Sequence, residues 1–412
     1  MTKQQHVLII GKVWIEPSSS AAGSRTLQLI DVFLKQGCTV SFATTAAHSD
    51  FKANLSALGI KEYNIELNNS SFDVFIKSLK PTLVLFDRFT TEEQFGWRVA
   101  EHCADALRVL DTIDLHCLRA ARHQAFKENR EFSSKDLFND TAKRELASIY
   151  RCDLSLMIST IEMDLLHQYF KVNPHLLHYI PFLAEPLTPA TQARWPSFRE
   201  REHFITIGNF LHAPNWDSTL YLKQTIWPLI RKQLPTAELH IYGAYPSQKV
   251  FQLHNQTEGF LIKGRAHSVE DVMKKAKICL APIRFGAGIK GKLMDAMLYG
   301  TPSITSPIGA ESMHGDLPWN GAIESNPEKF VEAAVKIYTD EITWQQTQQN
   351  GQQIINTFFS KAKHTLPFLS AISFIQTNLK AHRLNNFTGA MLMHHSLSAS
   401  KYMALWIEAK NK

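Results

Sequence analysis

Short apolar runs alternate with longer stretches of helical periodicity along most of the chain. Most of these runs are continuously apolar, which is typical of parallel strands buried on both faces. In the first part of the chain we expect strands at Val7–Ile10, Thr39–Thr44, Thr82–Asp87, Leu107–Asp111, Leu154–Ser159 and Leu177–Pro181. The spacing of apolar residues between them predicts helices at Ser24–Lys35, Phe72–Leu79, Thr91–His102, Leu115–Arg130, Asp136–Tyr150 and Ile161–Phe170. This order predicts a doubly wound α/β domain.

The alternation breaks at Glu185–Glu202, which holds three prolines and shows no periodicity, as is typical of a linker. Beyond it we expect strands at His203–Ile207, Glu238–Tyr242, Phe260–Lys263, Ile278–Pro282, Pro302–Thr305 and Ala322–Glu324. Helices are expected at Pro214–Arg231, Val269–Lys275, Lys292–Tyr299 and Pro327–Tyr338. The predicted division is therefore a Rossmann-like domain over 1–185, a linker over 186–202, a second Rossmann-like domain over 203–375 and a helical segment over 376–412.

Composition excludes several classes of protein. The 44 Lys and Arg against 38 Asp and Glu give a net charge of +6, which does not indicate nucleic acid binding but permits contact with phosphate or anionic lipid. Five irregularly spaced cysteines argue against a disulfide framework or a cysteine zinc site. No stretch resembles a signal peptide or the ~20 apolar residues of a membrane span. We therefore expect a cytoplasmic protein, with peripheral contact at the inner face of a membrane as an option.

The segment from Ala281 to Ser306 has the order strand, glycine-rich loop, helix, strand. Its loop contains Gly286, Gly288 and Gly291, which allow backbone amides to come close to a ligand. The first N–H groups of the following helix are unsatisfied and point into the loop. Three basic residues accompany the glycines: Arg284, Lys290 and Lys292. Together these features predict a phosphate or diphosphate site.

This loop has two alternative interpretations. Gly286–Leu293 matches seven of the eight positions of a P-loop, but Leu293 stands where Ser or Thr would hold Mg²⁺. We therefore do not expect a nucleoside triphosphatase. A glycine-rich turn with solvated lysines is the structural alternative, and the length of the pattern makes it less favoured.

The first domain carries further signals at the ends of its predicted strands. No Gly-x-Gly-x-x-Gly follows the first strand, which argues against a dehydrogenase. Arg25 lies in the first turn of a predicted helix, where a positive charge opposes the helix dipole, so we expect an anionic partner for it. Asp87 ends one strand. Asp111, Asp114 and His116 lie at the end of the next, and we expect this group to face the cleft between the domains.

The glycine-rich segment resembles the nucleotide-sugar loop of the retaining glycosyltransferases of family 4, which have the GT-B fold. The resemblance is carried by Pro282, Arg284, Gly286, Gly288, Lys290, Lys292, Ala296, Met297, Gly300 and Pro302. Ile207–Asn215, Ile241–Gly243 and Gly264–Ala266 resemble further donor-domain loops of that family. Lys401–Glu408 is similar to its terminal helix, which crosses back to the first domain.

The resemblance implies two facing Rossmann-like domains and the transfer of a hexose-type sugar from a nucleoside diphosphate sugar to an acceptor hydroxyl, with retention. The acceptor would be a glycan, a lipid-linked molecule or a protein, in polysaccharide or glycoconjugate synthesis, and neither a metal nor a cofactor is implied. The catalytic residues would be His116, Arg284 and Lys292. The donor-binding residues would be Gly23, Arg25, Gly208, Asn209, Asn215, Gly243, Gly264, Arg265, Gly288, Ile289, Lys290, Leu293 and Asp295. Asp87 and Asp114 would lie on the acceptor side.

Two positions depart from the family pattern, in which a pair of glutamates often contacts the donor. Asp295 replaces the second glutamate, and its shorter side chain would hold the ribose hydroxyls through a longer or water-bridged contact. Ala287 replaces the first and cannot contact the sugar hydroxyls. Two alternatives therefore stay open: a non-catalytic partner subunit that binds nucleotide or glycan, and a nucleotide-sugar epimerase on the same fold.

Overall fold

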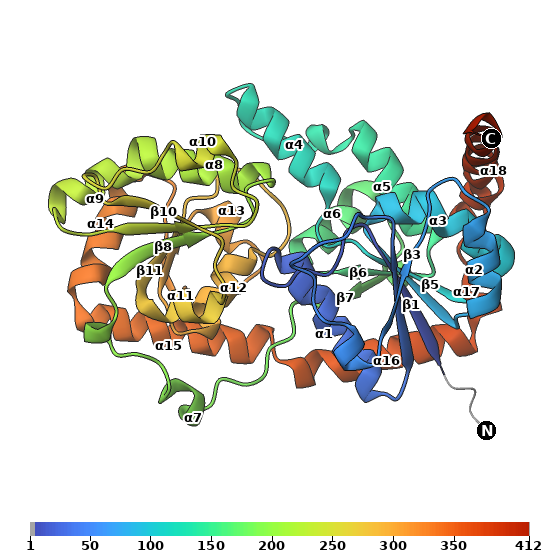
Figure 1. Cartoon of the computed structure of the whole chain (residues 1–412), viewed down its shortest axis with the longest axis horizontal. Coiled ribbons are helices and arrows are strands. Elements are labelled where there is room, and N and C mark those ends of the chain that lie inside the picture. The colour runs from blue at the N-terminus through green and yellow to red at the C-terminus, as the bar shows by residue number, and fades with distance from the viewer. Residues whose placement is uncertain (1–4, 412) are drawn as a thin grey trace.

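The computed structural model describes residues 5–411, apart from the side chains of residues 395–397. It contains two α/β domains that face each other, joined by a linker and by a run of C-terminal helices (Figure 1). The first sheet has seven parallel strands in the order β3-β2-β1-β4-β5-β6-β7. Its strands are β1 (His6–Gly11), β2 (Thr39–Thr44), β3 (Lys61–Asn64), β4 (Leu83–Asp87), β5 (Leu107–Asp111), β6 (Leu154–Met157) and β7 (Leu177–Tyr179).

The second sheet has six parallel strands in the order β10-β9-β8-β11-β12-β13. Its strands are β8 (His203–Ile207), β9 (Leu239–Tyr242), β10 (Phe260–Gly264), β11 (Ala276–Ala281), β12 (Ser303–Thr305) and β13 (Gly321–Ile323). In each sheet the chain starts near the middle and adds strands first to one side and then to the other. This topology places a switch point, where ligands bind in such sheets, beside the first strand of each domain.

Helices connect the strands within each domain and then extend beyond the second sheet. The first domain contains α1 (Ala21–Lys35), α2 (Ser71–Leu79), α3 (Phe89–His102), α4 (His116–Lys127), α5 (Asp140–Arg151) and α6 (Thr160–Phe170). The linker and second domain contain α7 (Pro189–Gln192), α8 (Ala213–Tyr221), α9 (Trp227–Gln233), α10 (Gln248–Phe251), α11 (Val269–Lys275), α12 (Gly291–Leu298), α13 (Pro307–Ala310), α14 (Pro327–Thr339) and α15 (Glu341–Phe358). The last helices are α16 (Lys361–Thr377), α17 (Leu379–Leu384) and α18 (Phe387–Asn411). Short 3₁₀ turns lie at Ser56–Leu58, Ser134–Leu137, Pro174–Leu176 and Phe198–Glu200.

The two doubly wound domains confirm the predicted fold class. Strand β3 was not predicted, because Lys61–Asn64 is short and polar and lies at the edge of the sheet, where no apolar run is needed. The helix predicted over Pro214–Arg231 is interrupted by a π-helical turn at Leu222–Ile226, between α8 and α9. The pattern of apolar residues continues through such a turn, so the sequence did not reveal it.

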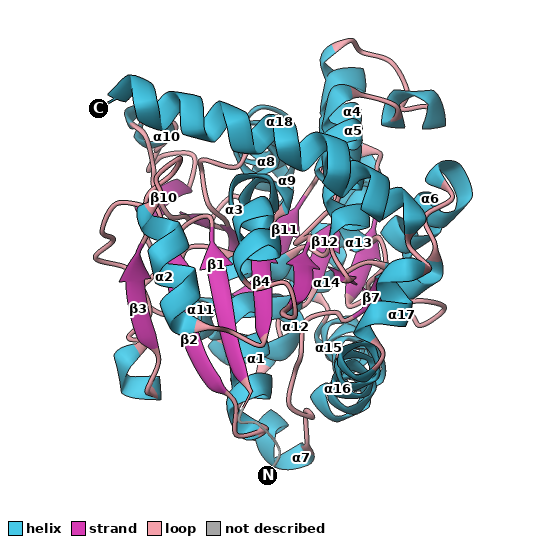
Figure 2. Cartoon of the chain, turned by 90° about the vertical axis from the view of Figure 1, so that its right-hand side faces the viewer, coloured by secondary structure: helices cyan, strands magenta, loops and turns pink. Residues whose placement is uncertain are grey.

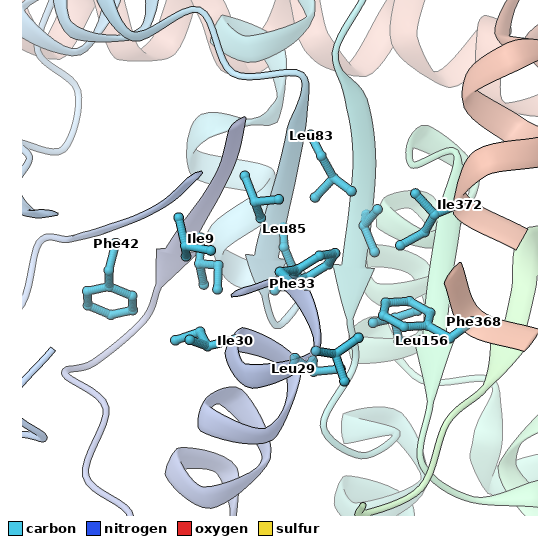
Figure 3. Close-up of a cluster of buried hydrophobic side chains, with 14 of the residues drawn as sticks. Ile9, Leu29, Ile30, Phe33, Phe42, Leu83, Leu85, Leu156, Phe368 and Ile372 are labelled. Atoms are coloured by element: carbon cyan, nitrogen blue, oxygen red, sulfur yellow. The ribbon is translucent and has the colours of Figure 1, made fainter. Parts of the chain in front are cut away.

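The core of the first domain includes residues from the C-terminal helices. Phe368 and Ile372 of α16 are buried against the same sheet face as Phe33 of α1 and Leu156 of β6 (Figure 3). The rings of Phe33 and Phe368 lie 5.8 Å apart between centroids. Helix α16 therefore packs on the first domain, whereas the sequence analysis assigned residues up to 375 to the second. Apolar periodicity marks a buried face without showing which domain covers it.

Two chain segments cross between the domains side by side. The N–H of Ala184 donates to the carbonyl of Phe359 (2.7 Å), and the N–H of Lys361 donates to the carbonyl of Ala184 (2.9 Å). After this crossing, α18 lies across α3 and α5 of the first domain (Figure 2). No helix within residues 5–411 is long and apolar enough to cross a bilayer.

Candidate active site in the interdomain cleft

A cavity of about 560 Å³ lies between the two domains. Its walls are the loops that follow β1, β4 and β5 in the first domain and those that follow β8, β9, β10 and β11 in the second. All of these loops leave the carboxyl ends of parallel strands, where α/β domains bind ligands. The predicted site residues that line this cavity are Asp114, His116, Gly208, Asn209, Asn215, Gly243, Gly288, Ile289, Lys290, Lys292 and Asp295.

The glycine-rich loop lies against the first domain. Gly288 has φ +64°, and a Cβ at this position would lie 2.8 Å from Cβ of Asp114. A Cβ at Gly291, where α12 begins, would lie 2.5 Å from Cβ of Ala21. Only glycine permits this approach, so the loop brings donor-side and first-domain residues into one site.

Lys290 and Lys292 are cations whose polar partners are neutral oxygens. Nζ of Lys290 donates to the carbonyl of Gly288 (2.7 Å), and Nζ of Lys292 donates to Oδ1 of Asn215 (2.8 Å). Across residues 5–411 neither ammonium group has a carboxylate within ion-pair distance. Burial lowers the pKa of both lysines to about 8. Two partly desolvated ammonium groups that form no ion pair, although the charge of Glu311 acts on Lys290, make this wall favourable for an anion.

We expect binding of a nucleoside diphosphate to weaken as the pH rises above about 8. The bound anion raises the pKa of Lys290 and Lys292 above the value of about 8 in the unliganded protein, so binding above pH 8 requires proton uptake. The contribution of the lysines to the affinity for nucleoside diphosphate is complete below pH 8. Above that pH the association constant falls by up to about tenfold per pH unit for each lysine that must be protonated. Isothermal titration calorimetry between pH 7 and 9.5, in buffers of different ionisation enthalpy, measures both effects. Constant affinity with no proton uptake would contradict this assignment.

The second domain also supplies a carboxylate and a glycine-lined floor. Asp295 of α12 lines the cavity, and burial raises its pKa to about 7. A Cβ at Gly208 would lie 2.7 Å from the side chain of Asn215, and a Cβ at Gly243 would lie 2.3 Å from the carbonyl oxygen of Gly208. The glycines therefore let the loops after β8 and β9 pack closely beneath the cavity.

On the first-domain side, a carboxylate orients His116. Nδ1 of His116 lies 3.1 Å from Oε1 of Glu145, which is buried and also accepts the backbone N–H of His116 (3.0 Å). This contact leaves Nε2 for a ligand. Burial alone would raise the pKa of neighbouring Asp114, but the charges of Arg119 and then of His116 outweigh it and lower that pKa to about 2. Asp114 is therefore ionised at neutral pH. Within residues 5–411 no cluster of three His, Cys, Asp or Glu side chains could hold a metal ion.

Glu162 connects the two walls of the site. It is 0% exposed, and its Oε1 accepts the N–H of Leu115 in the first domain (3.1 Å) and the N–H of Gly288 in the second (2.7 Å). Its Oε2 has no hydrogen-bond partner among the described residues. Burial, and then the charge of Asp114, raise the pKa of Glu162 to about 8. One oxygen of the Glu162 carboxyl group therefore holds together the loop that presents His116 and the loop that presents the two lysines.

Arg284, predicted to be catalytic, lies off the cavity. Its guanidinium forms a two-point contact with Asp217, from Nε at 2.9 Å and from Nη2 at 2.6 Å. It also lies over the rings of Tyr221 (4.4 Å) and Phe126 (4.6 Å), the latter from helix α4 of the first domain. Arg284 therefore joins the two domains beside the site. Asp217 lies 67 residues away in the sequence, so spacing did not reveal this pair.

We expect Arg284→Gln to affect stability more than turnover. The change leaves the Asp217 carboxylate without its partner and removes two cation–π contacts, which together are worth about 1–3 kcal/mol. A fall in Tm of several degrees, with kcat changed by less than about threefold, is the expected result, measured by thermal unfolding and steady-state kinetics. A hundredfold loss of kcat at unchanged Tm would restore the catalytic role predicted from the sequence.

Arg25 and the two aspartates at strand ends also lie off the cavity. Arg25 is 1% exposed; Nε donates to Asp111 (2.9 Å) and Nη1 to the carbonyl of Ile180 (2.7 Å). The expected anionic partner of Arg25 is thus an internal carboxylate. Asp87 accepts the N–H of Lys12 (3.2 Å) through Oδ2 and does not reach the cavity.

The other predicted residues off the cavity support its rim. Nη2 of Arg265 donates to Oγ of Ser18 (2.6 Å), so Arg265 connects the second domain to the loop after β1. A Cβ at Gly23 would lie 2.5 Å from the backbone of Glu16, which explains the glycine by packing. Gly264 has φ +73° at the end of β10, and Leu293 is buried in the core.

Several residues of the site were not predicted from the sequence. Glu145 lies on α5, between β5 and β6, and Glu162 lies on α6, after β6; the local pattern of Ser159–Glu162 fits a helix N-cap. Ser159 does cap α6, but the Glu162 carboxylate points to other loops. Among the lining residues that were not assigned a role, those with titratable side chains are Lys12, Arg88, Arg119 and His212. Their position after strands was the only available signal.

Comparison with known proteins agrees with this architecture. Residues 201–340 match the family model described as glycosyl transferases group 1. A search among curated proteins finds no significant match. Because the matched segment covers the second domain, it includes the glycine-rich loop and α12.

Solved structures match over nearly the whole chain. Sucrose-phosphate synthase from Thermosynechococcus elongatus is similar with TM-score 0.65 and 15% identity, over 91% of this chain and 100% of that one. S. aureus TarM, solved with fondaparinux, α-GlcNAc-glycerol and UDP, is similar with TM-score 0.68 and 10% identity, over 89% of this chain and 99% of that one. Anabaena HepE, solved with UDP and glucose, is similar with TM-score 0.63 and 13% identity, over 89% of this chain and 99% of that one. The chain therefore has the GT-B fold, and residues 201–340 form a domain of the group 1 glycosyl transferase type.

Proposed function

We propose that this protein is a retaining glycosyltransferase of family 4 that moves a hexose-type sugar from a nucleoside diphosphate sugar to an acceptor hydroxyl. The observation that carries the proposal is a pair of half-buried lysines that form no ion pair with the described residues, Lys290 and Lys292, on a glycine-rich loop that lines the same cleft as His116. Two solved neighbours, TarM and HepE, were solved with UDP, which supports a nucleoside diphosphate as the ligand of such a cleft.

The donor binds mainly to the second domain. Lys290 and Lys292 neutralise its diphosphate, Asp295 accepts hydrogen bonds from the ribose hydroxyls, and the loops at Gly208 and Gly243 leave room for the nucleoside. The lysines supply positive charge at the diphosphate, so we propose that the reaction needs neither a divalent cation nor a cofactor.

The difficult step is cleavage of the bond between the anomeric carbon and the diphosphate oxygen. The electron pair of that bond goes to the leaving diphosphate, and positive charge develops on the sugar ring. Lys292 and Lys290 stabilise the negative charge that develops on the leaving group. Asp114, ionised because of Arg119 and His116, lies on the opposite wall, where it stabilises the positive ring. Nε2 of His116 contacts a hydroxyl of the transferred sugar.

The acceptor approaches along the first domain. In the front-face mechanism implied by the family resemblance, its hydroxyl attacks from the side on which the diphosphate leaves, and the diphosphate takes the proton. Asp114, with a pKa of about 2, is too weak a base for this proton. The product anomer, determined by NMR, separates this mechanism from inversion with His116 as the base.

We propose that the acceptor is a glycan, a lipid-linked molecule or a protein in cytoplasmic polysaccharide or glycoconjugate synthesis, with peripheral membrane contact where the acceptor is lipid-linked. The net charge of this protein, +6, is compatible with contact with an anionic membrane surface and gives no reason to expect that the protein binds nucleic acid.

Release of free nucleoside diphosphate from a panel of nucleoside diphosphate sugars, with and without candidate acceptors, tests the proposal. Release that depends on an acceptor supports a transferase. Binding without release favours the non-catalytic subunit, for which Ala287 is the motivating departure. Conversion of the donor sugar without any acceptor favours the epimerase.

A further inference from the structure

Arg88 adopts a backbone conformation that is almost confined to glycine. Its φ of 72° and ψ of 156° lie where a side chain crowds the backbone. Arg88 immediately follows the central strand β4 and lines the cavity. Non-glycine residues persist in such conformations where the surrounding structure holds them, and they concentrate at ligand-binding sites. The strain at Arg88 therefore points to a task for its side chain.

The contacts of Arg88 hold its backbone and leave most of its guanidinium free. Its N–H donates to the carbonyl of Asp111 (2.9 Å), and its carbonyl accepts the N–H of Thr91 (3.1 Å). Nη1 donates to Oδ2 of Asp87 at 3.1 Å. In the described part of the chain, the other guanidinium nitrogens have no hydrogen-bond partner. One contact with the adjacent residue does not account for a strained arginine.

Two further cations lie on the same wall. Nζ of Lys12 has no ion-pair partner within residues 5–411, and burial, followed by the charge of Arg88, lowers the pKa of Lys12. Arg119 forms an ion pair with Asp114. Asp87 lies behind the wall and does not line the cavity. The first-domain wall therefore presents three cations and one carboxylate to the cavity.

We propose that Lys12, Arg88 and Arg119 bind a negatively charged group of the acceptor, a carboxylate or a phosphate. The identity of the ligand as an acceptor rests on the proposed function, whereas anion binding at this wall does not. The donor diphosphate is matched by Lys290 and Lys292 on the opposite wall, so the first-domain cations are left for a second anion. Free guanidinium nitrogens bind carboxylate and phosphate through paired hydrogen bonds, which lysine alone cannot do.

Thermal unfolding with three matched probes, glucose, glucuronate and glucose 6-phosphate, tests the proposal, with and without a saturating nucleoside diphosphate. We expect glucuronate or glucose 6-phosphate to raise Tm and glucose to leave it unchanged, and the responding probe identifies the anion as carboxylate or phosphate. Arg88→Gln should abolish the shift. Arg130→Gln is the matched control, because Arg130 is a first-domain arginine that pairs with Glu128 and Asp136 and does not line the cavity, and it should retain the shift.

Equal shifts with all three probes, no shift with any, or an unchanged response in Arg88→Gln would overturn the proposal. Stabilisation by an anionic sugar but by no nucleoside diphosphate would instead contradict the proposed function and leave the anion site in place. Arg88→Gly separates ligand binding from a structural role, because glycine relieves the strain. We expect its Tm without ligand to equal or exceed that of the wild type, while the response to the anionic sugar is lost. A fall of several degrees would assign Arg88 a structural role.

Discussion

Replacing Lys292 with alanine should lower kcat/KM for sugar transfer by about 10²–10³-fold, the usual cost of removing one preorganised contact to charge that develops in the transition state. Lys292 lies in the first turn of α12, and its ammonium group has Asn215 as its protein partner. The variant should also bind nucleoside diphosphate more weakly, because a charge-assisted contact to phosphate is removed. Steady-state kinetics and calorimetry measure the two effects.

The matched control for this variant is Lys249→Ala. Lys249 is an exposed lysine of the same domain, outside the cavity, so its removal changes net charge equally without touching the site. The control should remain within twofold of the wild type. If Lys292→Ala also stays within twofold for both affinity and turnover, Lys292 is a solvated lysine of a glycine-rich turn and the assigned site is wrong.

The second large effect is expected at Glu162. Glu162→Ala removes the acceptor of both the Leu115 N–H and the Gly288 N–H, so the lysine loop and the His116 loop lose their common attachment. We expect kcat to fall by on the order of 10²-fold, because displacement of reacting groups by about 1 Å has that cost. Glu162→Gln keeps an oxygen at the accepting position and should retain kcat within about threefold.

Small-angle X-ray scattering and thermal unfolding decide whether the loss of kcat in Glu162→Ala comes from displaced loops or from an unstable fold. We expect Glu162→Ala to increase the radius of gyration of the unliganded protein, because the domains separate, and Glu162→Gln to leave it unchanged. Arg122 adds a second contact across the domains through Glu311 and the carbonyl of Gly286, so the fold should persist. An alanine variant with full turnover, or a glutamine variant as impaired as alanine, would contradict the positioning role.

The strand and helix order of both domains could be predicted from sequence because buried parallel strands are continuously apolar. Val7–Ile10 and Leu83–Asp87 are clear examples, whereas the polar edge strand Lys61–Asn64 gave no such signal. The position of α16 could not be predicted, because Phe368 and Ile372 form the same pattern whichever domain they cover. Long-range packing alone decides that placement.

The phosphate-binding loop was predictable because its chemistry is local. Glycines at Gly286 and Gly288 and lysines at Lys290 and Lys292 are close in sequence and remain close in the fold. Charge pairing is not local. The sequence indicated that Arg25 needs an anion, but only the fold shows that Asp111 supplies it.

The role of Glu162 could not be predicted from the sequence either, because its partners are distant in the chain. Its place three residues after Ser159 fits a helix N-terminus, and nothing in the local pattern indicates that its carboxylate reaches Gly288, 126 residues further along the chain. Likewise, the left-handed backbone of Arg88 has no sequence signature, since such conformations usually select glycine. Glu162 is recognised in the structure because one of its oxygens accepts N–H groups from both domains. Arg88 is recognised by its backbone conformation and by the guanidinium nitrogens that lack a partner in the described part of the chain.

The most direct test of the account is a thermal-shift panel of UDP, GDP, ADP, dTDP and CDP in the presence of EDTA. A ligand at 100 times its Kd stabilises a protein by about 2.7 kcal/mol, which shifts Tm measurably. We predict that one nucleoside diphosphate stabilises the wild type in EDTA and that Lys292→Ala loses most of this shift. If none of the five shifts Tm, or if the shift requires a divalent cation, the central claim that two lysines hold a nucleoside diphosphate without metal is contradicted.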